Sequence, residues 1–84
     1  MNYRVIFSRS ARKQMERFSG ETETRLLAKL SALEANPRPS GCKKLKKRDA
    51  WRVRVGDYRI IYEIHDKVLQ VIVVTVGHRR EVYR

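Results

Sequence analysis

Three arginines stand close together in the stretch WRVRVGDYR, where they could bind a phosphate. Arg52 and Arg54 alternate with apolar residues, and Arg59 follows a Gly-Asp pair and a tyrosine. Guanidinium groups hold phosphate oxygens through paired hydrogen bonds and stay charged at neutral pH. An ordinary solvated strand face is the plainer interpretation. Three like charges at cross-strand distances disfavour folding, however, so the cluster favours a bound anion that offsets the repulsion.

A second group of reactive side chains stands near the C-terminus, in the stretch HRREVY. It holds His78, Arg79, Arg80 and Tyr83. A histidine can move a proton near neutral pH, an arginine can neutralise phosphate, and a tyrosine can stack on a base. A surface histidine, two solubilising arginines and a packing tyrosine form the plainer interpretation. Their concentration directly after an apolar strand indicates that they join the three arginines at one end of a sheet.

The overall charge favours a polyanionic partner. The chain of 84 residues carries 20 Lys and Arg against 9 Asp and Glu, which gives a net charge of +11 and a pI near 10.6. Such a surface attracts RNA, DNA, an acidic protein or an anionic membrane. Leu45 lies within a basic loop, which it is expected to anchor to the core. We expect the loop's cations to form a diffuse electrostatic surface; they are Lys43, Lys44, Lys46, Lys47 and Arg48.

Several kinds of chemistry lack the residues that they need. Cys42 is the single cysteine, which excludes an intrachain disulfide and fits a reducing cytoplasm. Two histidines without a carboxylate cluster of ligand spacing predict no metal site. There is no glycine-rich phosphate loop and no visible partner for a serine or cysteine nucleophile, so we expect no cofactor. The N-terminal stretch has no long apolar run, which predicts neither a signal peptide nor a membrane span.

The chain reads as one domain, residues 1–84, of the α+β class. A short β-rich run opens it, and two helices follow that are joined by about two residues and are therefore antiparallel. Leu26, Leu27, Leu30 and Leu33 are the expected buried stripe of the second helix, which ends at Asn36-Pro37. A loop and a three-stranded antiparallel meander complete the order. The first helix is expected to be capped by Ser8 or Ser10 and to end at Ser19-Gly20, and the second to begin near Glu21. The other expected bounds are a strand at 3–7, a loop at 37–50, and strands at 51–55, 58–65 and 68–76.

Alternation along the strands predicts two different faces of the sheet. Helices can cover only one face of so small a sheet, and the face left open carries Arg52, Arg54 and Arg59. The third meander strand is apolar on both sides, with Val71 and Val73 on one face and Val76 on the other, so we expect it to pair on both edges. The side chains expected to face the helices are Trp51, Val53, Val55, Tyr58, Ile60, Tyr62 and Ile64.

Two motifs and the order of elements resemble a known family. The stretches KKLKKRDAWRVRVGDYRIIYEI and VVTVGHRREVYR, in a strand, helix pair and meander, resemble the RelE branch of the RelE/ParE toxin superfamily. The resemblance implies the toxin of a type II toxin–antitoxin pair. It further implies a ribosome-dependent endoribonuclease, an mRNA interferase that cuts messenger RNA in the ribosomal A site and inhibits translation. The implied partners are a cognate antitoxin and the ribosome with its mRNA.

The resemblance also implies roles for individual residues. The family's basic pair falls on Arg52 and Arg54, and the next family arginine falls on Arg59. The later arginine and the C-terminal tyrosine fall on Arg79 and Tyr83. His78 could fill the histidine role of some relatives, whereas their carboxylate has no counterpart in the loop KKLKK. The basic loop, together with Arg80, is expected to contact ribosomal RNA.

Two functions of a different class remain open from the sequence. One is a ParE-like toxin that inhibits gyrase without nuclease activity, and the other is a plain nucleic-acid-binding module. Neither of them requires Arg59 to converge with the HRREVY stretch. Cleavage of translated messenger, with free RNA spared, would separate the nuclease from both.

Overall fold

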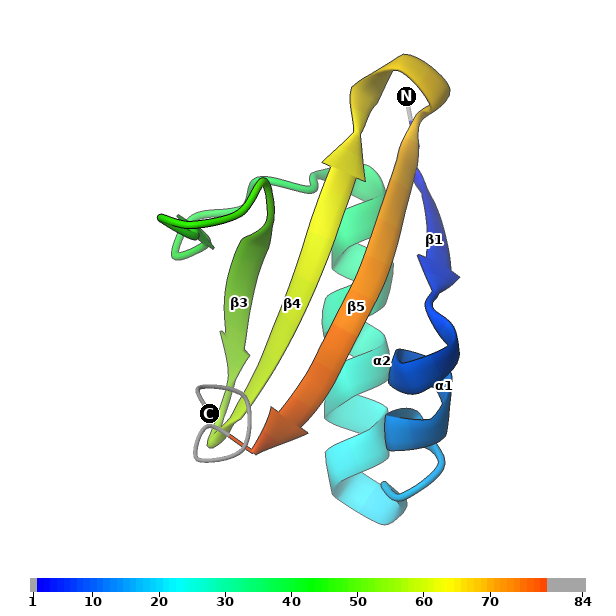
Figure 1. Ribbon diagram of the computed structural model, residues 1–84. Helices are drawn as coiled ribbons and strands as arrows, with labels where there is room; N and C mark the ends of the chain where they lie inside the picture. The colour runs from blue at the N-terminus through cyan, green and yellow to red at the C-terminus, as the bar shows by residue number, and fades with distance from the viewer. Residues whose placement is uncertain (1, 79–84) are drawn as a thin grey trace.

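A five-stranded sheet and two helices make up the structure, a computed structural model that describes residues 2–78 (Figure 1). The strand order is β1-β5-β4-β3-β2, in which β1 runs parallel to β5 and the other neighbours are antiparallel. The predicted α+β class is confirmed. The elements are β1 (Arg4–Phe7), α1 (Arg9–Met15), α2 (Gly20–Ala35), β2 (Lys43–Lys44), β3 (Trp51–Val55), β4 (Tyr58–His65), the 3₁₀ turn η1 (Asp66–Val68) and β5 (Gln70–His78).

The helix boundaries follow from local capping. Ser8 begins α1, since its side-chain oxygen accepts a hydrogen bond from the Ala11 N–H at 3.1 Å. The acidic residues Glu21 and Glu23 lie in the first turn of α2, where they suit the positive end of the helix dipole. The helix begins at Gly20, one residue earlier than predicted. The connection spans residues 16–19, so it is longer than the expected two residues.

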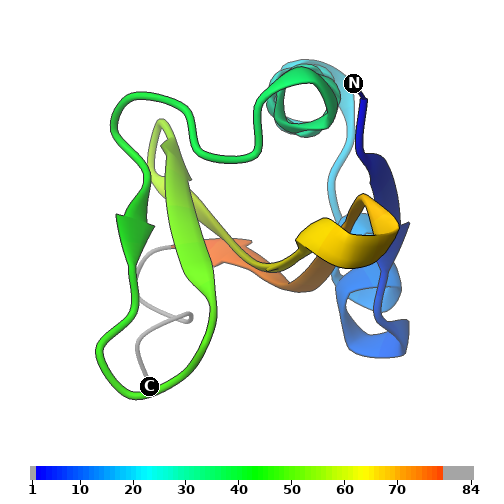
Figure 2. The same cartoon turned by 90° about the horizontal axis from the view of Figure 1, so that it is seen from above.

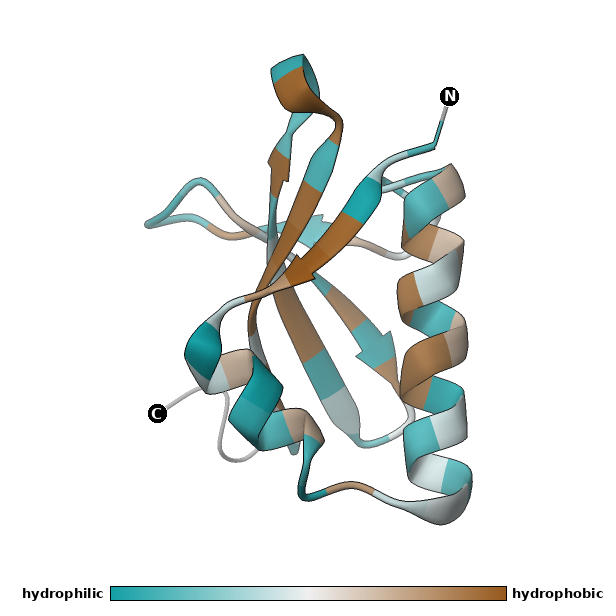
Figure 3. Cartoon of the chain, turned by 90° about the vertical axis from the view of Figure 1, so that its right-hand side faces the viewer, coloured by the Kyte–Doolittle hydropathy of each residue, from teal (hydrophilic) through white to brown (hydrophobic). Residues whose placement is uncertain are grey.

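One stripe of α2 packs against the sheet, which curves beneath it (Figure 2). Leu26, Leu30 and Leu33 are fully or almost fully buried, as predicted. The prediction for Leu27 was wrong, because 48% of this residue is exposed. One face of α2 is filled by Leu26, Leu30 and Leu33, which follow each other at four- and three-residue spacing. Leu27 comes one residue after Leu26, so its side chain points away from that face. Figure 3 shows apolar residues in the strands and the middle of α2, and hydrophilic ones in its first turn.

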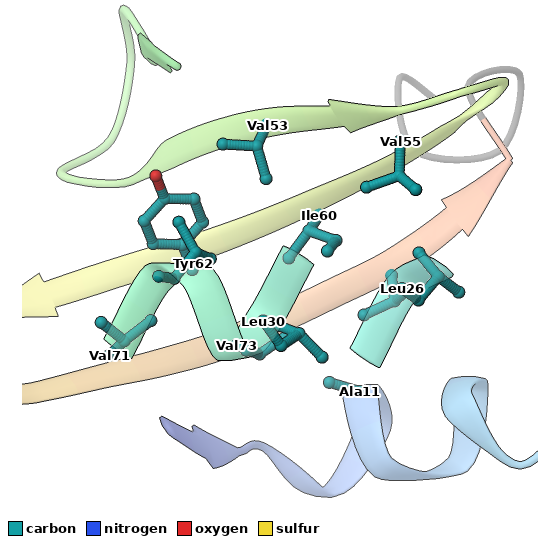
Figure 4. Packing of buried hydrophobic residues seen from close by; sticks show 11 residues of the cluster. Ala11, Leu26, Leu30, Val53, Val55, Ile60, Tyr62, Val71 and Val73 are labelled. Carbon is teal, nitrogen blue, oxygen red and sulfur yellow. The ribbon is translucent and has the colours of Figure 1, made fainter. Parts of the chain in front are cut away.

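The strands meet α2 through side chains that alternate as predicted. Val53, Ile60 and Tyr62 are buried in the core, where they face Leu26 and Leu30 (Figure 4). The bounds of β3 and β4 agree with the predicted strands. These two strands therefore present a core face toward the helix and leave their other face for the arginines.

A β-bulge in β5 changes the predicted faces of its second half. Ile61 pairs with Thr75 while Tyr62 pairs with Val73, which leaves Val74 as an extra residue. Val76 consequently returns to the core, where it is 1% exposed, and its predicted place on the opposite face was wrong. The expected pairing of this strand on both edges is confirmed. It begins at Gln70 rather than Val68, because the 3₁₀ turn η1 precedes it.

The segment from 37 to 50 is not wholly a loop. Two of its residues form β2, with Lys43 opposite Arg52 and Lys44 opposite Trp51. Leu45 is half-buried but does not belong to the set of side chains packed on the core, so its predicted anchoring role was wrong. Other contacts hold the segment: Cys42 packs on the core and the Tyr62 hydroxyl donates to the Pro37 carbonyl oxygen at 2.7 Å.

A surface cluster joins three distant parts of the chain. Asp66, in the turn after β4, accepts hydrogen bonds from the Tyr3 hydroxyl and from both terminal nitrogens of Arg38. Arg38 also lies over the Trp51 ring, 5.4 Å from its centroid. The cluster ties the N-terminal segment and the residues after α2 to the far end of β4. No helix within residues 2–78 is long and apolar enough to cross a membrane.

Candidate phosphate-binding site

Four cations share the face of the sheet opposite α2. Arg54 on β3 stands directly across from Arg59 on β4, and Arg52 lies two residues along β3 on the same face. Lys43 on β2 pairs with Arg52 and so presents its side chain to this face too. Directly opposed residues in an antiparallel sheet have Cβ atoms about 5 Å apart, which is close enough for two guanidiniums to hold one phosphate. We call this set the arginine face.

The arginine face borders a hollow of about 320 Å³. This volume is at the lower end of the range for small-ligand sites, and it suits a group of phosphodiester size. Besides the arginine face, its lining includes Ser40 and Gly41 from the segment before β2 and Lys29 from α2. Gly41 has a φ of +92°, a conformation that favours glycine, and it bends the chain beside the hollow. The lining of the hollow thus combines cationic side chains with the Ser40 hydroxyl group.

Arg59 differs from its neighbours in burial. Only 7% of it is exposed, and it is the single charged residue that is buried among those that the structure describes. The prediction that it would be exposed on the open face was therefore wrong. Its Nη1 atom donates to the Tyr58 carbonyl oxygen at 3.3 Å. Arg52 is half-buried and Arg54 is exposed. The guanidinium groups of the arginine face therefore range from a buried one at Arg59 to a solvated one at Arg54.

His78 lies on the other face of the sheet. It stands opposite Tyr58, whose ring it meets edge-on at a centroid distance of 5.6 Å. Tyr58 in turn packs edge-on against Phe18. His78 and Tyr58 border a hollow of about 220 Å³ on the helix side, together with Gln14. The structure therefore brings Arg52, Arg54 and Arg59 together and places His78 away from them.

The remaining predicted site residues fall into two groups. Arg79, Arg80 and Tyr83 lie outside the described residues. In the basic loop, Lys44 lies 3.4 Å from Asp49, and an Arg48 nitrogen lies 3.9 Å from a Glu63 oxygen. Lys46 and Lys47 are exposed. Of the loop cations, Lys43 alone belongs to the hollow, so the others form a separate basic surface beside it.

A carboxylate and a histidine also share the open face, at its far end. Glu63 Oε1 and His65 Nε2 are 2.9 Å apart. Glu63 lies four residue steps beyond Arg59 along the extended strand, which corresponds to about 13 Å, and His65 is about 7 Å farther. A phosphate held at Arg59 is therefore beyond the reach of this pair.

Sequence reasoning missed Lys29, which lines the hollow from the helix. Its place was detectable in part: Lys29 follows Arg25 at a four-residue spacing, which puts both on one polar face of α2. Only the structure shows that this polar face lies beside the edge of β3. Within residues 2–78, no three His, Cys, Asp or Glu side chains are placed to hold a metal ion.

The family model described as "ParE toxin of type II toxin-antitoxin system, parDE" matches residues 5–83. The chain belongs to this toxin family. The predicted membership of the RelE/ParE superfamily is therefore confirmed, and the chain is a type II toxin of that superfamily with a RelE-like fold. No curated protein matches the toxin in sequence.

Solved RelE structures share the toxin's fold. The toxin superposes on a chain of the archaeal RelE–RelB complex from Pyrococcus horikoshii OT3 with a TM-score of 0.82 and 28% identity, covering 94% of this chain and 97% of that one. The isolated E. coli RelE toxin gives a TM-score of 0.81 and 27% identity, covering 96% and 90%. The intact E. coli RelBE toxin–antitoxin complex gives 0.80 and 25%, covering 90% and 95%.

Proposed function

We propose that this toxin is an endoribonuclease that cuts messenger RNA in the A site of the ribosome and thereby inhibits translation. The observation that carries the proposal is the cross-strand pair Arg54–Arg59 beside Arg52, at a hollow of about 320 Å³. A module that only needs to attract nucleic acid has no use for a buried guanidinium such as Arg59. A catalytic site that must stabilise charge at a fixed point does need a buried guanidinium, because preorganised donors are most effective where water is excluded.

The reaction uses the RNA's own 2′-hydroxyl as nucleophile. Its oxygen attacks the adjacent phosphorus while its proton leaves to a base, and the bond from phosphorus to the 5′-oxygen breaks with a proton delivered to that oxygen. The products are a 2′,3′-cyclic phosphate and a 5′-hydroxyl. Negative charge builds on the phosphorane, and Arg52, Arg54 and Arg59 supply the compensating cations, joined by Arg79 in the proposed site.

Arginine is unsuited to the proton transfers, since its pKa lies far above neutral pH. His78 has a suitable ring, but its side chain lies with Tyr58 on the helix side. A role for His78 in proton transfer would require the ring to reach the arginine side of β5. The ribosome compensates for an incomplete acid–base pair by holding the messenger in a reactive geometry, an effect that can contribute a large part of a rate enhancement. Tyr83 would stack on or orient a base.

Two partners follow from the proposal. The basic loop, with Lys46 and Lys47 exposed and with Arg80, would contact ribosomal RNA. A cognate antitoxin would restrain the toxin, as solved complexes of RelE with RelB from P. horikoshii and E. coli indicate by analogy. The net charge of +11 favours an acidic antitoxin segment. The site of action would be the cytoplasm, where ribosomes translate.

The experiment compares messenger cleavage by the purified toxin with translating ribosomes and with free RNA. Primer extension should map cuts in codons occupying the A site, and free RNA should be spared. The main alternative takes its support from the ParE description of the matching family. Inhibition of gyrase supercoiling without any messenger cleavage would establish that function in place of the nuclease.

A further inference from the structure

Half of β3 has an uncovered edge. β2 pairs with β3 only at Trp51 and Arg52, and no other strand among residues 2–78 pairs with this edge. The side of α2 that carries the small residues Ala28 and Ala32 lies beside the uncovered half. Between helix and strand there is a second hollow of about 410 Å³, which is open to solvent.

Cations connect this second hollow to the arginine face. Lys29 and Arg54 border both hollows, and Arg25 borders the second one. A continuous basic path therefore leads from the arginine face around the edge of β3 to α2. None of these three side chains has a carboxylate within ion-pair distance among the described residues. Lys29 is half-buried, which makes an uncompensated charge there costlier than on an open surface.

The basic path ends at Arg25, whose guanidinium lies beside Gly56 in the β3–β4 turn. A Cβ atom at Gly56 would lie 3.2 Å from Arg25 Nη2 and 3.4 Å from Nη1. Gly56 also has a φ of +59°, so the turn itself favours glycine. The absence of a side chain lets the Arg25 guanidinium lie against the turn. The exposed Arg25 side chain thus reaches the β3–β4 turn from a position one helical turn before Lys29.

We propose that Arg25 and Lys29 form a second phosphate subsite, which holds the RNA strand next to the phosphate bound at the arginine face. The proposal rests on the proposed function for the identity of the bound strand. Two features favour RNA over an acidic peptide. Lys29 and Arg54 are shared, so a strand that occupies the first hollow continues into the second without a break. The second hollow has only small apolar groups, Ala28, Ala32 and Val55, and so has no deep pocket for peptide side chains.

The test measures RNA binding to the double variant Arg25→Gln, Lys29→Gln. The probe is a single-stranded RNA of about ten nucleotides, a length typical of single-strand sites, with 2′-O-methyl groups that block self-cleavage. Each lost phosphate contact on a single strand lowers the slope of log K against log salt by about 0.7, so the double variant should lose about 1.4. A dinucleotide, whose single phosphate fills only the first hollow, should bind the single variant Arg25→Gln and the wild type equally, because Arg25 borders the second hollow and not the first.

The matched control is Arg9→Gln, Lys13→Gln on α1, which removes two exposed cations at the same spacing outside both hollows. If the control lost as much of the slope of log K against log salt, the effect would come from net charge alone, and the subsite proposal would be overturned. An unchanged slope in the Arg25, Lys29 variant would overturn it as well. A glutamate-rich peptide that binds the wild type but not this variant, while RNA binding is retained, would instead assign the second hollow to a protein partner.

A second measurement separates this proposal from the proposed nuclease. On translating ribosomes the single variant Arg25→Gln should raise KM with kcat retained, because Arg25 borders only the second hollow and binds substrate and transition state alike. If the wild type cuts no messenger, the nuclease proposal fails, yet the salt slopes still decide the subsite. If the wild type cuts and the slopes do not change, the subsite alone fails.

Discussion

Arg54 and Arg59 stand directly opposite each other on β3 and β4, on the face of the sheet that α2 leaves uncovered. Like charges in such a pair destabilise a sheet by some tenths of a kcal/mol up to about 1 kcal/mol. A phosphate bound between the two guanidiniums would offset this repulsion.

Replacing Arg54 by Gln should separate stability from activity. The exposed Arg54 side chain contributes repulsion to the fold, so the variant should gain about 0.2–1 kcal/mol in free energy of unfolding. Loss of one phosphorane-stabilising group should lower kcat for messenger cleavage by about 10²–10³. Urea denaturation and single-turnover cleavage measure the two effects. A variant that is destabilised and fully active would disprove this assignment.

Arg59 should tolerate no substitution, including lysine. Arg59→Lys retains the charge but loses the planar fork, so cleavage should fall although the charge is kept. Because Arg59 is buried, Arg59→Ala should also destabilise the fold by removing packed side-chain carbons. Thermal unfolding of the two variants would reveal that difference. Full activity of Arg59→Lys would mean that only the charge matters.

Tyr62 is expected to be essential for stability but not for chemistry. It is fully buried, and its hydroxyl donates to the Pro37 carbonyl oxygen. Tyr62→Ala should cost about 3–5 kcal/mol, enough to unfold much of so small a domain. Tyr62→Phe should cost about 1–3 kcal/mol, because it leaves that buried carbonyl without its donor. Denaturant titration distinguishes the two. A loss of cleavage by a stably folded Tyr62→Phe variant would contradict the structural role.

Asp66 should make stability depend on pH in the acid range. Hydrogen bonds from Arg38, and then from Tyr3, lower the pKa of Asp66 from 3.8 to about 2 in the folded toxin. A lowered folded pKa means that the unfolded chain takes up the proton first as pH falls. The stabilising contribution is therefore fully present about one pH unit above 3.8, and it is lost as pH falls through 3.8 toward about 2. Melting temperatures of wild type and Asp66→Asn should converge as pH falls through this window; a constant gap would refute the assignment.

The sequence predicted β3 and β4 to the residue, because apolar alternation and the Gly56-Asp57 turn are both local signals. It could not reveal the bulge at Val74, since nothing in an all-apolar strand marks an extra residue. That one residue reverses the faces of the rest of β5. Without it, His78 would lie on the face opposite Val71 and Val73, with the arginines. With it, His78 meets Tyr58 on the helix side.

Burial and long-range neighbours were likewise hidden from the sequence. Arg59 was predicted on the correct face, but the burial of a charged group depends on what the tertiary structure places around it. Lys29 was assigned no role, since only the packing of α2 beside the edge of β3 brings it to the hollow. The Arg52, Arg54, Arg59 cluster was predictable because strand alternation and one tight turn were sufficient to align it.

The most direct test of the nuclease account uses a messenger whose A-site codon carries a 2′-deoxy nucleotide at the mapped cleavage position. We predict that the toxin cuts the all-ribose messenger on the ribosome, leaving a 2′,3′-cyclic phosphate and a 5′-hydroxyl, and that the single deoxy substitution abolishes cleavage. Equal cleavage of the deoxy-substituted messenger, or fragments that carry a 5′-phosphate, would contradict attack by the 2′-hydroxyl and the role given to the arginine face.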